Sequence, residues 1–404
     1  MEVYVARQPV LDKNKKTYGY ELLFRDGMSN AFPDIGGDTA TSKVLSNTFF
    51  SIGIEKITGG KKALINFTED LLLKKLPLMF PPEKIMVEVL EDVEPGKEVI
   101  NACKEIAEKG YEVALDDFFY KADLDPLIAL ARVIKIDFMA TPMDEIRELV
   151  DKLAVYDVIF LAEKVETYEE FQQALDMGFE YFQGYFFSKP EILKGTDISS
   201  SKLSLLQIVA EANKADFNFE ELEKLIQQDV SISYKLMRYI NSAYFRRVQE
   251  ISSIKHAILL LGEKEVRRFI SLLGMANLAA DKPDELICAS IIRARLCELL
   301  GKECSSGVNE SELFTLGLFS HIDAIMDDSI RNLMEKLPLS EGIKDALVNG
   351  EGQLADFLSL TSFYETGDWK GIREMAEKVG LEDEKIPELY MDAVGWADSL
   401  AGAQ

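Results

Sequence analysis

The feature of this sequence that most constrains its fold is a unit repeated through residues 1–190. Short apolar runs with high strand propensity, such as residues 158–162, each end in a polar and usually ionisable residue, and segments of helical character separate them. An alternation of strands and helices is typical of a parallel sheet with helices packed on it. Roughly seven or eight such units fit a small TIM-like (β/α) barrel, which is the fold that we predict for this half of the chain.

The spacing of apolar residues between these runs indicates where the helices lie. Val99, Ala102, Cys103 and Ile106 are separated by intervals that place them on one face of a helix. Two later segments show the same kind of pattern. We therefore predict helices over residues 97–109, 143–154 and 167–177, each followed by another strand.

The polar residues that follow the strand-like runs are the candidate functional residues. In a (β/α) barrel the carboxyl ends of the strands meet at one mouth, and active sites lie there. A single glutamate at such a position is usually solvated or caps the next helix, but several carboxylates at one mouth repel one another unless cations lie between them. In chain order these residues are Glu21, Asn66, Glu88, Asp116, Asp117, Lys135, Glu163 and Gln183.

The chemistry of this set indicates which cation would fit. Hard oxygen ligands favour Mg²⁺, Mn²⁺ or Ca²⁺ over zinc. The two histidines of the chain, His256 and His321, are too few for a site built on several imidazoles. The pattern therefore predicts a divalent metal site, of the kind in which two ions activate water for in-line attack on a phosphodiester.

The pattern changes near residue 199. Strand-like runs end, the serines at 199–201 are typical of a linker or a helix cap, and amphipathic stripes begin. We predict a barrel domain over residues 1–198 and an all-helical domain over residues 199–404. The stripes that predict helices lie within residues 205–212, 232–240, 254–261 and 266–273.

Composition excludes several classes of partner. The 45 basic and 70 acidic side chains give a formal charge of −25, which argues against nucleic-acid polymers and anionic lipid but allows a small phosphorylated ligand. No apolar run approaches the ~20 residues of a membrane span. The N-terminus lacks the basic and hydrophobic regions of a signal peptide. The four cysteines form no Cys-x-x-Cys pair, so we expect reduced thiols in a cytoplasmic protein.

Eight short motifs follow one another along residues 1–195. They are Gln8-Pro9-Val10, Glu21-Leu22-Leu23-Phe24-Arg25, Ile65-Asn66-Phe67, Glu88-Val89-Leu90-Glu91, Asp116-Asp117-Phe118-Phe119, Lys135-Ile136-Asp137, Ala162-Glu163-Lys164-Val165-Glu166 and the stretch from Gln183 to Pro190. In this order they resemble the motifs of an EAL domain, the cyclic di-GMP phosphodiesterase module. The resemblance covers nearly half of the chain.

The resemblance implies a role for each matching residue. One Mg²⁺ or Mn²⁺ ion would be held by Glu21, Asn66, Glu88 and Asp116, and a second by Asp116, Asp117 and Glu163. Lys135 would orient the attacking water and stabilise developing charge, and Glu21, Glu163 and Lys135 together form the expected catalytic group. Glu91 and Glu166 would support loops near the site. The nucleotide pocket would be shaped by Gln8, Arg25, Gln183 and Pro190.

Two departures from the family pattern bear on activity. After Asp117 the family has a glycine-threonine-glycine-tyrosine loop that couples metal binding to substrate and dimerisation, whereas this chain has Phe118 and Phe119. Replacing glycines with aromatic residues should change the conformational freedom of that loop. Lys164 also stands where the A-E-G-V-E motif has glycine, so an ammonium lies beside the site carboxylates and could partly replace a metal charge.

The helical half carries a second resemblance. The stretches 226–229, 236–243, 251–254 and 257–262 are similar to those of an HDOD domain, a helical module related to HD phosphohydrolases but generally without their metal site. Where an H-D pair could fall, Ser320 precedes His321, and serine cannot replace a metal-binding histidine. We predict structural roles for His256 and His321, and core packing for Trp369 and Trp396. The domain would be a non-catalytic interaction or regulatory module.

Three functions remain open on the sequence. The chain is an enzyme that hydrolyses cyclic di-GMP to pGpG, a receptor that binds cyclic di-GMP without turnover, or an interaction scaffold. The retained ligand set favours the first two, and the altered loop after Asp117 separates them without indicating a direction. The resemblance allows a homodimer and leaves the protein partner of the helical domain unidentified.

Overall fold

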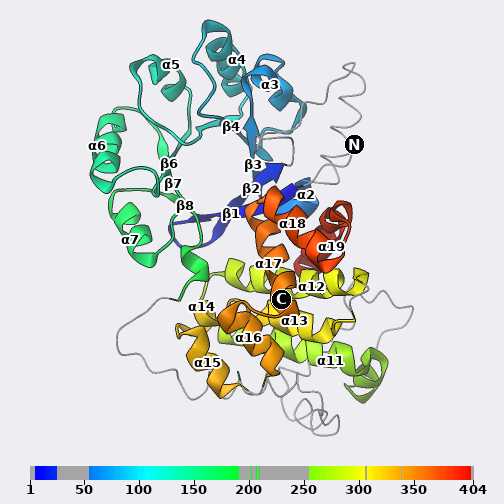
Figure 1. Ribbon diagram of the computed structural model, residues 1–404. Coiled ribbons are helices and arrows are strands. Elements are labelled where there is room, and N and C mark those ends of the chain that lie inside the picture. Colours follow the sequence, from blue (N-terminus) through cyan, green and yellow to red (C-terminus); the bar gives the residue numbers. More distant parts are fainter. Residues whose placement is uncertain are drawn as a thin grey trace. The chain divides into compact units, whose positions relative to one another are not determined.

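The computed structural model describes residues 5–24, 54–190, 254–304, 307–337 and 339–401, together with 202, 206 and 209 (Figure 1). The chain divides into two compact units, of which the first is Met1–Lys189 with Tyr364–Trp369 and the second is Pro190–Phe363 with Lys370–Gln404. The predicted domain boundary at 198/199 and the predicted helix over 232–240 lie outside the described residues, so both stay predictions.

A closed eight-stranded barrel forms the first unit, as the alternation of strands and helices predicts. Neighbours in sequence are neighbours in the barrel, which closes where β1 meets β8. The strands are β1 (Val5–Asp12), β2 (Thr17–Phe24), β3 (Lys62–Phe67), β4 (Ile85–Val89), β5 (Glu112–Leu115), β6 (Val133–Asp137), β7 (Ile159–Glu163) and β8 (Tyr181–Gln183).

The prediction of a parallel sheet is correct for β2 to β8 and wrong for β1. β1 pairs antiparallel with both β2 and β8, with Val10 opposite Gln183. The reason is the short connection between β1 and β2, since a parallel crossover needs a dozen or more residues. Asp12 closes that connection by accepting hydrogen bonds from the backbone N–H groups of Asn14 (2.8 Å) and Lys16 (2.9 Å).

Helices surround the strands of the first unit (Figure 1). The three helices predicted from apolar spacing are present, and their ends agree with the prediction to within a residue. The last of them begins with a capping box, in which the Glu170 N–H donates to Thr167 Oγ1 at 3.1 Å. The helices are α2 (Glu55–Thr58), α3 (Glu69–Leu73), α4 (Lys97–Glu108), α5 (Asp125–Ile128), α6 (Met143–Leu153) and α7 (Tyr168–Asp176), with 3₁₀ turns η2 (Leu76–Met79), η3 (Ala122–Leu124) and η4 (Phe186–Ser188).

The barrel interior contains a layer of buried apolar side chains. Six strands contribute one residue each, and all six side chains are at most 1% exposed, so the centre of the barrel is packed rather than open. This packed layer supports the side chains that lie nearer the mouth of the barrel. Its members are Val10, Leu64, Met86, Ala114, Val133 and Leu161.

The described part of the second unit is helical. Gly317 allows α12 and α13 to approach closely, because a Cβ there would lie 2.5 Å from the Arg293 carbonyl oxygen. None of the described helices combines the length and the hydropathy needed to cross a membrane. The helices are α11 (Ile254–Leu278), α12 (Asp284–Glu303), α13 (Glu310–Phe319), α14 (Ile322–Met326), α15 (Ile330–Lys336), α16 (Glu341–Asn349), α17 (Gln353–Thr366), α18 (Trp369–Val379), η6 (Asp383–Lys385) and α19 (Ile386–Ala401).

The two tryptophans differ in their surroundings. Trp396 is 3% exposed and packs edge-to-face on Phe314 at 6.1 Å, so its predicted place in a core is correct. Trp369 is only half-buried and lies in the short segment grouped with the barrel, edge-to-face with Tyr364. The prediction of core packing is therefore wrong for Trp369, which follows the turn at Gly367 (φ 69°) and lines the pocket at the barrel mouth.

Candidate active site

The candidate site forms where the apolar interior of the barrel gives way to polar side chains at the mouth. Residues two positions apart on a strand point to the same side, so the residue two positions after each inward-pointing apolar one also points inward. This places five predicted site residues above the apolar layer. They are Asn66 (two after Leu64), Glu88 (two after Met86), Asp116 (two after Ala114), Lys135 (two after Val133) and Glu163 (two after Leu161).

Lys135 lies at the centre of this group. Its side chain is fully buried, and four carboxylates from four other strands or strand ends surround its ammonium. Burial alone would lower the pKa of Lys135, but the four carboxylates outweigh it and hold the pKa well above the usual range. The Nζ distances are 2.6 Å to Asp116, 2.9 Å to Glu88, 2.9 Å to Glu163 and 3.4 Å to Glu21.

One ammonium does not balance four carboxylates, three of which are buried. Burial raises the pKa of Glu163 to about 8, and it raises the pKa of Glu88 well above the usual range, in each case against the attraction of Lys135. The nearby carboxylates Asp116 and Glu21 raise both pKa values further. The group therefore carries an excess of negative charge, which added cations or bound protons would relieve.

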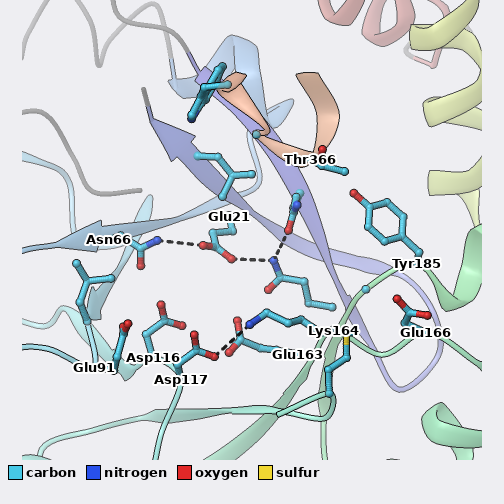
Figure 2. Close-up of a pocket in the computed structure, with 18 of the residues that line it drawn as sticks. Glu21, Asn66, Glu91, Asp116, Asp117, Glu163, Lys164, Glu166, Tyr185 and Thr366 are labelled. Atoms are coloured by element: carbon cyan, nitrogen blue, oxygen red, sulfur yellow. Dashed lines mark hydrogen bonds and ion pairs between the residues drawn. The ribbon is translucent and has the colours of Figure 1, made fainter. Parts of the chain in front are cut away.

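A chain of hydrogen bonds joins the carboxylate group to β1 and β8 (Figure 2). Asn66 Nδ2 donates to Glu21 Oε1 at 3.0 Å. Gln183 Nε2 donates to Glu21 Oε2 at 2.7 Å and to Gln8 Oε1 at 3.0 Å. These bonds orient Glu21, and they bring together four predicted residues that are up to 175 positions apart in sequence.

Asp117 and Lys164 form the edge of the group nearest β6 and β7. Lys164 is ion-paired with Asp137, and its Nζ lies 3.6 Å from Asp117 Oδ1. Both Asp117 (φ 39°) and Lys164 (φ 53°) have left-handed backbone conformations at the strand ends. Sequence reasoning missed Asp137 as a site residue, although its position two after Lys135 was the signal that it points to the same side of β6.

The loop after Asp117 is anchored by its first aromatic residue. Phe118 is buried, and its N–H donates to the Lys135 carbonyl oxygen at 3.0 Å. Phe119 is 53% exposed. Tyr120 donates to Asp125 at 3.1 Å and lies under the Lys152 ammonium. The replacement of the family glycines thus gives a loop attached to β6 on one side and to α5 and α6 on the other.

The remaining predicted residues lie on the rim or beyond it. Glu91 is exposed and lines the pocket, and Glu166 also lines it while pairing with Lys189 at 2.9 Å. Pro190 is half-buried but does not line the pocket. Arg25 lies outside the described residues, so its predicted contact with the nucleotide stays a prediction.

The pocket above these residues has a volume of about 720 Å³. Two exposed apolar or aromatic side chains on its lining were not predicted, Met139 (68% exposed) and Tyr185 (38% exposed). Tyr185 follows Gly184, whose φ of 142° turns the chain at the end of β8, so strand periodicity could not indicate its direction. The pocket therefore offers apolar surface beside the carboxylates (Figure 2).

The donor set at the mouth fits a hard divalent cation. Among the described residues, Glu88 Oε2, Glu163 Oε2 and Asn66 Oδ1 are buried without a hydrogen-bond partner, an arrangement that costs free energy. In the part of the chain that the structure describes, no group of three Asp, Glu, His or Cys side chains is arranged to hold a metal ion. At the mouth, the Lys135 ammonium lies between the carboxylates. Oxygen donors of this kind are those that Mg²⁺ and Mn²⁺ prefer.

His321 shows no sign of a metal site in the helical unit. It precedes α14 rather than lying inside a helix, is 6% exposed, and has Ser290 Oγ at 3.3 Å from its Nδ1. Burial, aided by Arg293, lowers the pKa of His321 well below its usual value, so the ring is neutral. The side chain of His256 is outside the part of the chain that the structure describes, so its structural role stays a prediction.

A closed barrel with one reversed strand and carboxylates at its mouth, followed by a helical unit, defines the class of this protein. The EAL domain model matches residues 46–190, and the HDOD domain model matches residues 200–337. The chain belongs to the family of proteins that join an EAL domain to an HDOD domain.

Two curated relatives match over essentially the whole chain. A Vibrio cholerae protein named cyclic di-GMP phosphodiesterase CdgJ is 38% identical over 400 residues, covering 98% of this chain and 93% of that protein. The uncharacterized protein YuxH of Bacillus subtilis is 36% identical over 412 residues, covering all of both chains.

Solved structures with an EAL domain are more distant. An EAL domain protein from Listeria monocytogenes is 20% identical, with a TM-score of 0.35 over 46% of this chain and 87% of that one. The Bacillus subtilis YkuI protein, solved with cyclic di-GMP and calcium, is 17% identical, with a TM-score of 0.36 over 65% of this chain and 73% of that one.

Proposed function

We propose that this protein hydrolyses one phosphodiester bond of cyclic di-GMP to give linear pGpG, with the aid of two divalent ions. The observation that carries the proposal is the buried Lys135 among four carboxylates at the mouth of an EAL-type barrel. The full-length relative CdgJ, at 38% identity, carries the name of that activity and supports the same function.

The residues fall into groups by chemistry. Bound Mg²⁺ or Mn²⁺ would supply a nucleophile by lowering the pKa of water and would neutralise phosphate charge. The ammonium of Lys135 holds water and stabilises negative charge that develops on the phosphate. Gln183 orients Glu21 by donating to it, Gln8 accepts a hydrogen bond from Gln183, and both present amide groups to the nucleotide. The residues that would hold the ions are Glu21, Asn66, Glu88, Asp116, Asp117 and Glu163.

Incubation of the full chain with cyclic di-GMP and Mn²⁺ or Mg²⁺, followed by chromatography of the products, tests the proposal. We expect linear pGpG as the product, and no product when the divalent ions are chelated. Tight binding of unchanged cyclic di-GMP would instead support the receptor function that the altered loop after Asp117 leaves open. Neither binding nor hydrolysis would contradict both functions.

We expect Mn²⁺ binding to release protons and to strengthen as the pH rises toward 8. Burial raises the pKa of Glu163 to about 8, and a protonated carboxyl must lose its proton before both oxygens can bind a metal. Calorimetric titrations of the full chain in buffers of different ionisation enthalpy count the protons released. An affinity that is the same at about pH 6.5 and about pH 8.5 would contradict this assignment.

Glu112→Gln is the matched control for this titration. Glu112 begins β5 at the end of the barrel opposite the site and pairs with Lys62 at 2.5 Å. The variant removes one barrel carboxylate without touching the group around Lys135. It should therefore keep the pH dependence of the unmodified chain.

The helical unit is best interpreted as an interaction or regulatory module. The buried carboxylate of Glu298 is satisfied within the unit, since it pairs with Arg268, Arg295 and Lys264. His321 is neutral, and no other histidine is present among the side chains that the structure describes in this unit. A protein partner is proposed for this unit, in line with the HDOD model that matches residues 200–337.

A further inference from the structure

We propose that Lys164 is a built-in cation that competes with a divalent ion for Asp117, so that the mouth binds one ion tightly and a second ion weakly. The inference rests on the proposed function, because it assumes that the barrel mouth binds metal. Its basis is the ammonium of Lys164, which is ion-paired with Asp137. The same ammonium lies 3.6 Å from Asp117 Oδ1 (Figure 2).

The backbone holds Lys164 in place. The next residue is bonded on both sides, since the Val165 N–H donates to the Gln183 carbonyl at 3.0 Å and the Val165 carbonyl accepts from the Phe186 N–H at 3.1 Å. Lys164 itself has φ 53°, a left-handed conformation that favours glycine over a residue with a Cβ. The ion pairs of its side chain offset that strain.

Asp137 keeps the ammonium beside Asp117. Its carboxylate is 7% exposed and accepts hydrogen bonds from the Met139 N–H (2.7 Å) and the Ala140 N–H (2.9 Å). Burial would raise the pKa of Asp137, but the hydrogen bonds from Lys164 and the two N–H groups outweigh it and lower the pKa. Asp137 is thus a fixed anion, and it is ion-paired with Lys164.

The effect of Lys164 is confined to one side of the site. Lys135 contacts carboxylates at both proposed ion positions, Glu88 at one and Glu163 at the other, so it opposes both ions alike. The ammonium of Lys164 is an additional positive charge that lies beside Asp117. A positive charge a few ångströms from a metal position opposes a divalent ion there. A divalent ion held by Asp117 should therefore bind more weakly than one held by Glu88 and Asn66.

Calorimetric titration of the full chain with Mn²⁺ tests this inference. Lys164→Gln should tighten the weaker of the two binding events by about tenfold and leave the tighter one unchanged. Lys164→Arg, which keeps the charge, should behave as the unmodified chain does. Lys189→Gln, which removes a rim ammonium paired with Glu166 at 2.9 Å, is the control for net charge and should change neither event.

The outcomes separate this inference from the proposed function. If the unmodified chain binds Mn²⁺ but Lys164→Gln changes neither event, Lys164 is no competitor and the metal site stands. A tightening in Lys164→Arg equal to that in Lys164→Gln would also overturn the inference, because contact geometry rather than charge would then be responsible. If the unmodified chain binds no Mn²⁺ at all, the proposed function fails together with the inference.

Discussion

Replacing Lys135 with alanine should lower the rate of pGpG formation by about 10²–10³-fold, the usual cost of losing one donor that stabilises transition-state charge. The affinity for cyclic di-GMP should change much less, because the nucleotide contacts proposed for Gln8, Gln183 and Arg25 do not involve the ammonium. Lys135 is fully buried and within 3.4 Å of four carboxylates, so it is held in one position and stays protonated. Product chromatography and nucleotide calorimetry measure the two quantities on the same preparations.

The variant also removes the cation from a buried group, which commonly costs about 3–5 kcal/mol of stability. Circular dichroism in the presence of Mn²⁺ must therefore show that the variant is folded at the assay temperature. Lys282→Ala is the matched control, because Lys282 is 5% exposed on its side chain and pairs with Asp327 at 2.6 Å in the helical unit. It should keep full turnover. An equal loss of turnover and nucleotide affinity in Lys135→Ala would make Lys135 a binding residue.

Asp116→Asn and Glu88→Gln should each weaken Mn²⁺ binding by at least about a hundredfold, since each removes a charged ligand rather than a supporting contact. Asp116 and Glu88 lie 2.6 Å and 2.9 Å from the Lys135 ammonium, in the part of the mouth where buried acceptor oxygens lack donors. Neutralising either carboxylate also reduces the excess of negative charge that attracts cations.

Calorimetry with Mn²⁺ measures the affinity of these variants, and circular dichroism checks their fold. Glu112→Gln again serves as the control, because it changes a carboxylate of the same barrel at the opposite end. Its Mn²⁺ affinity should equal that of the unmodified chain. Mn²⁺ affinities of Asp116→Asn and Glu88→Gln that match the control would show that the metal ligands lie elsewhere.

The strand and helix pattern of the first half was readable because each element is defined by short-range periodicity. Helices over 97–109, 143–154 and 167–177 follow from apolar residues at helical spacing, and the structure contains them. β1 was not anticipated as a reversed strand, since its direction depends on a four-residue connection and on closure against β8. Closure is a property of the whole sheet and not of any one strand.

The sequence by itself determined which residues face the mouth, because a strand alternates with a period of two and Asn66, Glu88, Asp116, Lys135 and Glu163 each stand two positions after an apolar residue. Only the tertiary structure decided which of them touch. Barrel closure brings Lys135 to Glu21, 114 positions away in sequence, and attaches Lys164 to Asp137 rather than to the glutamates beside it. Contacts between strands depend on register and barrel tilt, which are set by packing of all eight strands together, and no local pattern records them.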